Sequence, residues 1–309
     1  MNINKKIVLF HYSQSGQALE IAQSICNPLA GEGYELVYKA IEPKEPFPFP
    51  WNRKTFFETF PETRLGIPPF GIKAIDLSDV ADAGLVVIAG QSWYLSPSLP
   101  IQAFFMDETI KNYLKGKNIV HISGCRNMWV IAQLKIRRSI SEAGGNYVGH
   151  IVLQDNRPNL ISVLTIIRWL FYNKKEASYG LPAAGVDDEE IKAASRFAPV
   201  LNEALKFNDW NSLQEKLMQA QAVEYKPSLA FVEKAGHRIF EIWAKFIRQK
   251  GEYQDKRRAF RLQLFFYYLL FVLYVISPFG LLFFYLTYPF RARSIKKERR
   301  EMCFELGEI

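Results

Sequence analysis

Cysteine is scarce in this sequence, and the few copies present are too scattered to build a metal centre. Cys26, Cys125 and Cys303 are the only cysteines among 309 residues, and no two of them have metal-ligand spacing. The chain also does not open with a signal peptide. We therefore expect no bound metal and a location in the reducing cytoplasm.

The sequence also lacks the two commonest nucleotide-binding motifs. No Lys follows Gly16, which excludes a nucleoside-triphosphate P-loop, and no Gly-x-Gly-x-x-Gly run is present for a dinucleotide. Instead, an apolar run at residues 7–10 predicts a buried strand, and residues 19–25 carry helical spacing. The loop between them consists of Ser13, Gln14, Ser15, Gly16 and Gln17.

A strand-to-helix turn of this composition suits a phosphate group. Backbone N–H groups at the start of a helix point outward and attract an anion. Ser13 and Ser15 would add hydroxyl donors, and Gly16 would let the backbone approach the ligand. The loop therefore favours the phosphate of FMN; the alternative is that these residues only cap the helix.

A second predicted strand, residues 84–89, ends in an aromatic loop. That loop carries Gln91, Ser92, Trp93 and Tyr94. In open parallel sheets, ligands bind outside the carboxyl ends of the strands, where the strand order reverses. The loops after the first and third strands would face one crevice, so we expect Trp93 and Tyr94 to flank a flavin ring. The alternative is that they cap the core beneath the next helix.

A third loop, Gly124, Cys125, Arg126 and Asn127, follows the predicted strand at 118–123. It would reach the same edge of the sheet. Arg126 and Asn127 are expected to bond the pyrimidine edge of the flavin or a substrate carboxylate, although Asn127 also suits a helix N-cap. Cys125 belongs to this cofactor-binding loop, and we interpret its thiol as a small buried group rather than a redox centre.

These three loops resemble the flavodoxin-like superfamily over about residues 3–155. The resemblance implies an α/β fold, a doubly wound parallel sheet of five strands, with FMN as the cofactor. Ala18 departs from the pattern, because many members keep a hydroxyl residue there that also touches the phosphate.

The net charge of +8 does not indicate nucleic acid, because the basic excess lies near the carboxyl end. Residues 262–290 contain no charged side chain, and twelve of these twenty-nine are aromatic. As a helix this run would be about 43 Å long, more than the roughly 30 Å of membrane hydrocarbon. The run therefore predicts contact with a membrane.

Helix-breaking residues within the apolar run and basic residues on both sides of it indicate how it would sit in the membrane. Ser277, Pro278 and Gly280 interrupt the apolar run, and both of its flanks are rich in Lys and Arg. Because basic flanks stay cytoplasmic, we favour a re-entrant helical hairpin in the inner leaflet over a single span. A helix pair buried in a soluble core is the remaining alternative. The expected location is the cytoplasmic face of the inner membrane, as a monotopic or single-span protein.

Three parts are expected along the chain. Residues 1–155 form the FMN-binding domain, 156–250 a helical accessory region, and 251–309 the basic-flanked hairpin and tail. In the accessory region, Ile239, Phe240 and Trp243 share one face of a basic amphipathic helix. A proline-rich stretch at 43–51 is expected to run extended near the first crevice.

Several segments together resemble a narrower group, the bacterial dialkylresorcinol condensing enzymes. The segments are residues 46–51, 60–63, 92–98, 124–129 and 155–160. The resemblance implies a role in making the resorcinol ring of dialkylresorcinols and flexirubin-type pigments, beside a partner ketosynthase.

The residues themselves favour oxidation over condensation. Condensation needs a Cys–His pair, but His121 and Cys125 would lie about 13 Å apart on one strand. Removing two hydrogens from an alkylated cyclohexanedione gives an aromatic resorcinol, and a flavin supplies that chemistry. Tyr94, Arg126 and His11 are the candidates to take the substrate proton or to hold an enolate.

Two other functions remain open at this stage. The chain could be a membrane-attached flavodoxin-type quinone reductase or porphyrinogen oxidase, which would pass electrons without any diketone. It could also be a non-catalytic scaffold that holds the ketosynthase at the membrane. The expected partners are an alkyl diketone, membrane lipid and the ketosynthase.

Overall fold

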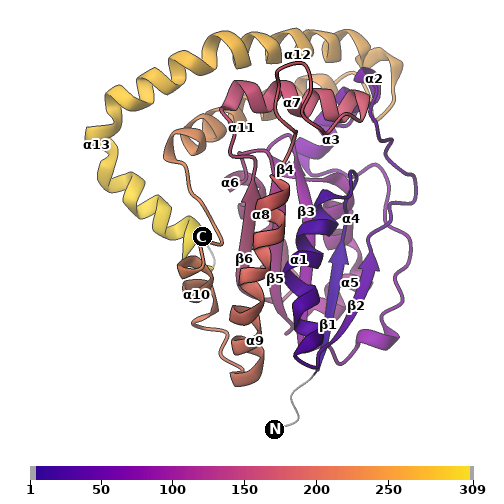
Figure 1. The fold of residues 1–309 in the computed structure, drawn as a ribbon. Coiled ribbons are helices and arrows are strands. Elements are labelled where there is room, and N and C mark those ends of the chain that lie inside the picture. The colour runs from indigo at the N-terminus through magenta and orange to yellow at the C-terminus, as the bar shows by residue number, and fades with distance from the viewer. Residues whose placement is uncertain (1–4, 307–309) are drawn as a thin grey trace.

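The computed structural model describes residues 5–306, which are built around a parallel β-sheet (Figure 1). The long strands are β1 (Lys6–His11), β2 (Glu35–Ala40), β3 (Leu85–Trp93), β5 (Asn118–Cys125) and β6 (Asn146–Gln154). They are hydrogen-bonded in the order β2-β1-β3-β5-β6, and the short β4 (Ser96–Pro97) pairs antiparallel with the end of β3. Without β4 this is the 2-1-3-4-5 order of flavodoxin-like sheets. The predicted fold class is confirmed.

The strand order reverses beside β1. This strand pairs with β2 on one side and with β3 on the other, so that Phe10 lies between Lys39 and Ile88. The carboxyl ends of the strands point toward the top of the molecule in Figure 1. The loops that follow β1 and β3 therefore start next to each other at this edge.

Helices cover both faces of the sheet because alternate strand residues point to opposite sides. Ile7 and Leu9 face α1 (Gln17–Gly31), whereas Val8 and Phe10 face the opposite layer. That layer contains α4 (Leu99–Met106), α5 (Glu108–Leu114) and α6 (Val130–Glu142). The short η1 (Ser78–Val80) lies at its margin, with Val80 buried.

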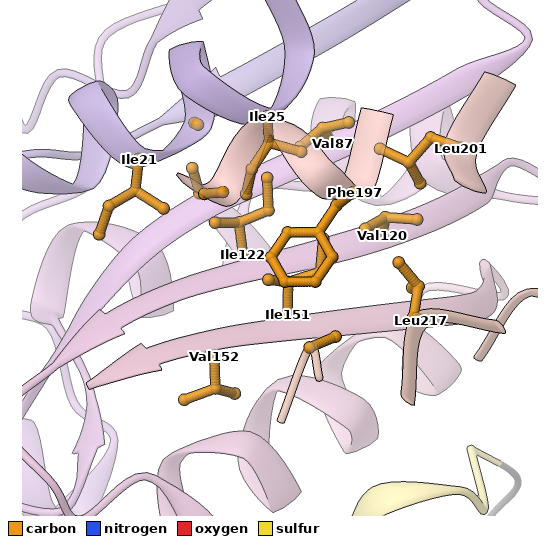
Figure 2. Close-up of a cluster of buried hydrophobic side chains, with 14 of the residues drawn as sticks. Ile21, Ile25, Val87, Val120, Ile122, Ile151, Val152, Phe197, Leu201 and Leu217 are labelled. Atoms are coloured by element: carbon orange, nitrogen blue, oxygen red, sulfur yellow. The ribbon is translucent and has the colours of Figure 1, made fainter. Parts of the chain in front are cut away.

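The segment after β6 completes the α1 side of the sheet. α8 (Asp188–Ala193), η2 (Ala194–Phe197), α9 (Ala198–Phe207) and α10 (Leu213–Gln219) cover this side, whereas α7 (Asn159–Tyr172) lies across the carboxyl edge of the sheet (Figure 1). Phe197, Leu201 and Leu217 join the same core cluster as Ile25 and Ile151 (Figure 2). The division of the chain at residue 155 stays a prediction, but α9 and α10 pack directly against the sheet domain.

Three further helices lie over the carboxyl edge of the sheet. They are α2 (Arg53–Glu58), α3 (Phe60–Leu65) and α11 (Pro227–Arg248). Phe57 and Phe60 pack with Ala244 and Ile247 of α11 in a separate apolar cluster. This layer separates the strand ends from the C-terminal helix.

The C-terminal region differs from the expected hairpin. η3 (Lys256–Arg258), α12 (Ala259–Phe271), a π-helical turn (Val272–Ile276) and α13 (Ser277–Cys303) form one continuous helix. Pro278 has no N–H for the carbonyl four residues earlier, and the π turn shifts the hydrogen-bond ladder at that point. The proline is therefore absorbed within the helix, which crosses the top of the molecule and then turns down its side (Figure 1).

Candidate functional site

The loop after β1 leaves a row of backbone donors free. Gly16 precedes α1 with a φ of 91°, a conformation that favours glycine. Within residues 5–306, the amides of Ser15, Gly16, Gln17 and Ala18 have no hydrogen-bond acceptor. The Ser13 hydroxyl oxygen accepts from the Leu19 amide at 3.2 Å, which leaves its proton available to a ligand. We call residues 13–18 the cradle.

One acidic group lies beside the cradle. The carboxylate of Glu20, in the first turn of α1, would lie 3.6 Å from a Cβ built on Gly16. Glu20 is exposed, so its flexible side chain can turn toward solvent. In its present position the carboxylate partly neutralises the positive end of the helix dipole.

The proline-rich stretch closes over the cradle and is held there by Gln14. The Gln14 side chain donates to the Pro48 carbonyl at 2.9 Å and accepts from the Trp51 indole N–H at 3.1 Å. Gln91, at the end of β3, donates to the same Gln14 oxygen at 3.4 Å. The Trp51 amide also donates to Leu170 of α7. We call residues 43–51 the strap.

Gln17 has a structural partner of its own. Its side-chain amide donates to the Val186 carbonyl at 3.1 Å, and its oxygen accepts from the Val186 amide at 3.0 Å. The approach is close because Gly185 has no side chain: a Cβ there would lie 2.6 Å from Gln17 and 2.7 Å from Trp169. Gln17 can therefore offer a ligand its backbone amide but not its side chain.

Trp93 forms an aromatic wall next to the cradle. Its ring contacts Tyr12, Phe47 and Trp51 edge-on, with centroid distances of 6.0, 5.3 and 5.5 Å. Edge-to-face packing of this kind holds the rings in fixed positions. The flanking of a flavin ring by Trp93 stays a prediction, and the Trp93 ring also packs against the apolar core on the α4 side of the sheet.

Tyr94 points away from the wall. Both Tyr94 and Leu95 have positive φ, 48° and 60°, in the tight turn that joins β3 to β4. The Tyr94 hydroxyl donates to the Phe56 carbonyl at 2.8 Å, and its ring packs on Phe60. Burial raises the pKa of this phenol well above its usual value. Ser92, the other predicted residue of this loop, pairs with Pro97 in the same turn.

The third loop is fastened to α7. Arg126 donates to the Asn159 side-chain oxygen at 2.7 Å, and the Asn127 side-chain amide donates to the same atom at 2.9 Å. Burial lowers the pKa of Arg126 to about 10. The side-chain oxygen of Asn127 is buried and has no partner among residues 5–306. It is an acceptor that a ligand N–H could satisfy.

The remaining predicted residues are placed as follows. Cys125 is half-buried, and burial raises the pKa of its thiol, which fits its interpretation as a packing residue. Gly124 packs against α1, where a Cβ would lie 2.9 Å from Ile21. His11 is half-buried at the end of β1, and its imidazole has no hydrogen-bond partner in the described part of the chain. Burial lowers its pKa, so the imidazole is neutral near pH 7.

Glu233 of α11 is the main residue at this edge that sequence reasoning missed. Its carboxylate accepts from the amides of Val130 and Ile131, at 3.3 and 2.8 Å, and so caps the start of α6. Burial raises its pKa to about 7. Because its partners lie about a hundred residues away, no local pattern marks it; only its position on an otherwise apolar side of a helix gives a signal.

A second set of polar contacts fixes the start of α7. Asp155 accepts from Arg157 at 3.1 Å and from the Ser162 hydroxyl at 2.6 Å. Arg157 also pairs with Asp187, and Arg168 donates to backbone carbonyls of residues 174–182. Both arginines are thus used within the protein.

The residues present fit the polar ends of FMN. Free amides and a serine hydroxyl at β1 suit a phosphate, and the unpaired Asn127 oxygen at β5 suits the N3–H of a flavin. Strands β1 and β5 are two positions apart in the sheet, about 10 Å, a separation that an extended flavin mononucleotide can bridge. Trp93, from the intervening β3, lies between these two ends.

Comparison with known proteins gives structural neighbours only. No protein-family model matches the chain, and no curated protein matches its sequence. A flavodoxin from the domain Archaea superposes with a TM-score of 0.36 at 14% identity, over 65% of this chain and 99% of its own. A WrbA-like flavodoxin from Agrobacterium tumefaciens gives 0.37 at 10% identity, over 66% and 98%. An azoreductase from Bacillus anthracis gives 0.30 at 14% identity, over 62% and 99%.

Proposed function

We propose that this protein binds FMN and works as a flavin-dependent oxidoreductase. The observation that carries the proposal is the row of unpaired amides at Ser15–Ala18, located where the strand order reverses. Backbone amides at the start of a helix bind phosphate without any further group. The unpaired oxygen of Asn127 supports the same ligand from the other end.

The residues have separate tasks in this proposal. The cradle amides and the Ser13 and Ser15 hydroxyls hold the phosphate. Asn127 orients the ring through its unpaired oxygen, and Trp93 limits the ring on one side. The strap, fixed by Gln14, keeps water away from the reacting atoms.

For the substrate, we propose an alkylated cyclohexane-1,3-dione that becomes a resorcinol. This ring loses two hydrogens, one as a hydride and one as a proton, and tautomerises to the aromatic diol. Bound FMN would supply the hydride acceptor. The family resemblance of the sequence supports this substrate class, in which the alkyl chains are lipid-like.

His11 is the proposed proton acceptor. Its imidazole is neutral and has no partner in residues 5–306, whereas the other two candidates are engaged. Tyr94 donates to Phe56, and Arg126 donates to Asn159. A neutral imidazole at the end of β1 can take a proton at its free nitrogen. Arg126 keeps a positive charge at this edge that would favour an enolate.

The proposed location is the cytoplasmic face of a membrane. The helix Lys256–Cys303 is long and apolar enough to cross a bilayer, and only 11% of its most apolar window is buried in the protein. A lipid-like substrate would be concentrated there, and a partner ketosynthase could deliver it at the same surface.

Spectroscopy of the full-length protein tests the proposal. The protein, purified in detergent and supplied with FMN, is expected to retain a flavin spectrum after gel filtration. Anaerobic addition of a dialkylcyclohexanedione should bleach the flavin while one resorcinol forms per flavin reduced. A retained but unbleached flavin would contradict the substrate assignment, and rapid reoxidation of the reduced flavin by a quinone, without any diketone, would favour an electron carrier.

A further inference from the structure

The C-terminal helix carries a long exposed apolar surface. Exposed large side chains recur along it from α12 to the middle of α13: Phe260, Leu264, Tyr267, Phe271, Tyr274, Val275, Ile276, Phe279, Leu282, Phe283, Tyr285, Leu286, Tyr288 and Phe290. Phe279, Leu286 and Phe290 are 66%, 68% and 91% exposed. Contiguous apolar surface of this extent marks an interaction site.

The beginning of this helix is anchored on the globular body. Arg258 is fully buried and donates to both carboxylate oxygens of Glu62 in α3, at 2.8 and 2.9 Å. Two helical turns further, Phe265 stacks on Phe60 with 3.7 Å between ring centroids. A buried charge pair of this kind is costly to separate. The start of the helix therefore stays against α3.

The end of the helix is anchored on the same body. Cys303 is buried in the main core, and its carbonyl accepts from the Gln214 side chain of α10 at 2.8 Å. Five residues earlier, Glu298 pairs with Lys234 of α11 at 2.7 Å. Between these anchors one side of the helix rests on α11, where the buried Phe284 lies 5.6 Å from the Phe231 ring, while its other side is exposed. We call this curved helix the arch (Figure 1).

Two anchors on one body exclude a crossing of the membrane. A spanning helix needs its ends on opposite sides of about 30 Å of hydrocarbon, whereas both ends of this helix contact the same domain. We propose that the arch lies in the plane of the membrane surface, with its exposed aromatic side immersed in one leaflet. This proposal deepens the proposed location and resolves it as monotopic.

The charges next to the arch identify an anionic bilayer as the partner. Arg293, Lys296 and Arg299 follow the apolar run, are exposed, and form no ion pair within the described part of the chain. Basic side chains beside an in-plane apolar helix bind acidic headgroups. Tyrosines along the arch suit the same headgroup level.

Neighbouring helices extend the surface toward the candidate site. On α11, Ile239, Ile242 and Phe246 are exposed at helical spacing, and Arg261 of α12 lies 3.8 Å above the Phe246 ring. Below this layer, Phe171 of α7 contacts Phe56, which in turn contacts Trp51 of the strap. An immersed arch would therefore bring the strap close to the lipid surface.

Vesicle binding tests the partner. Full-length protein is mixed with phosphatidylcholine vesicles that contain either no phosphatidylglycerol or a third of it, and bound protein is separated by flotation. We expect roughly 100-fold weaker binding without the anionic lipid. The double variant Arg293→Glu, Lys296→Glu should bind the anionic vesicles at least about tenfold more weakly than wild type. The control Lys5→Glu, Lys115→Glu changes the same charge at the amino edge of the sheet and should bind like wild type.

Binding that ignores anionic lipid, or a dimer that hides the arch and floats with no vesicles, would overturn the proposal. FMN absorbance is recorded on the same samples. A protein that binds vesicles without flavin would refute the proposed cofactor alone, and a yellow protein that ignores vesicles would refute the arch alone.

Topology is tested on inverted membrane vesicles, in which the cytoplasmic face is outside. Cysteines introduced by Glu252→Cys and Ser294→Cys should both react with an impermeant maleimide, with wild type as the blank. A nitroxide attached through Phe279→Cys should lie about 5–10 Å below the headgroups. A flank labelled only after detergent, or a nitroxide near the bilayer centre, would contradict an in-plane arch.

Discussion

Gln17 and Val186 are joined by two hydrogen bonds, although 169 residues separate them in the chain. The Gln17 side chain donates to the Val186 carbonyl and accepts from the Val186 amide, so it behaves like a strand partner for one residue. This contact fastens the loop after α7 to the first turn of α1. The cradle is therefore rigid on its α1 side before any ligand binds.

Gln17→Ala should lower the free energy of unfolding by about 2–3 kcal/mol. The substitution removes two hydrogen bonds and leaves the Val186 amide and carbonyl buried without partners. Urea denaturation followed by circular dichroism measures the change. Gln263→Ala, at an exposed position on α12, is the control and should cost less than about 0.5 kcal/mol. Equal effects of the two substitutions would show that the contact contributes nothing.

Gly185 and Gly180 provide a matched pair for the same loop. Both have positive φ, 81° and 74°, but a Cβ at Gly185 would collide with Gln17 and Trp169, whereas a Cβ at Gly180 meets no atom within 4 Å. Gly180→Ala should cost about 1 kcal/mol from backbone strain alone. Gly185→Ala should cost at least about 2 kcal/mol more. Thermal melts of both variants give the comparison, and indistinguishable melting temperatures would contradict the close packing.

Glu233 should make stability depend on pH. Its pKa in the folded protein is raised to about 7 by burial, above its usual value of 4.5, so the folded state holds more protons between these two values. Stability should therefore fall as pH rises from about 4.5 to 7, with a slope of up to about 1.4 kcal/mol per pH unit, and level off above pH 7.

Glu233→Gln removes that titration, so the slope between pH 5 and 7 should become smaller in the variant. Urea midpoints at several pH values measure both proteins. Parallel curves for wild type and variant would mean that Glu233 titrates normally in the fold.

Arg258 should contribute more to the free energy of unfolding than its neighbour Arg257. Arg258→Ala removes one of the two arginines that pair with the buried Glu62, the other being Arg248 at 3.1 Å, and should cost about 3 kcal/mol. Arg257 pairs with Asp255 at the surface, with 75% of its side chain exposed, and Arg257→Ala should cost under about 1 kcal/mol. Proteolysis after residue 258 should also become faster only in the Arg258 variant. Similar losses in both variants would argue against a fixed arch.

Local sequence patterns predict part of this architecture but not all of it. The polar loop at 13–17 and the apolar runs of the strands depend on neighbouring residues, so their pattern predicts the sheet and the first loop. The position of Tyr94 depends on positive φ at Tyr94 and Leu95, which no residue preference signals for these side chains.

Local sequence patterns do not predict contacts between segments that lie far apart in the chain. Glu233, Asn159 and Val186 each reach the strand ends from more than thirty residues away, and their polar character alone does not indicate a target. The expected hairpin is wrong for a different reason: Pro278 indicates a break in the helix, but a π turn before it keeps the helix continuous.

Equilibrium titration of the full-length protein with FMN and with riboflavin tests the central claim most directly. The two ligands share a ring and differ in the phosphate, so the cradle should favour FMN by on the order of 100-fold, through two or so charge-assisted hydrogen bonds. Ser15→Asp should weaken the binding of FMN by at least about tenfold and leave the affinity for riboflavin unchanged. The control Ser195→Asp, on the exposed surface of η2, should change neither affinity. Equal affinity for the two flavins, or no binding of either, would contradict a phosphate site at residues 13–18.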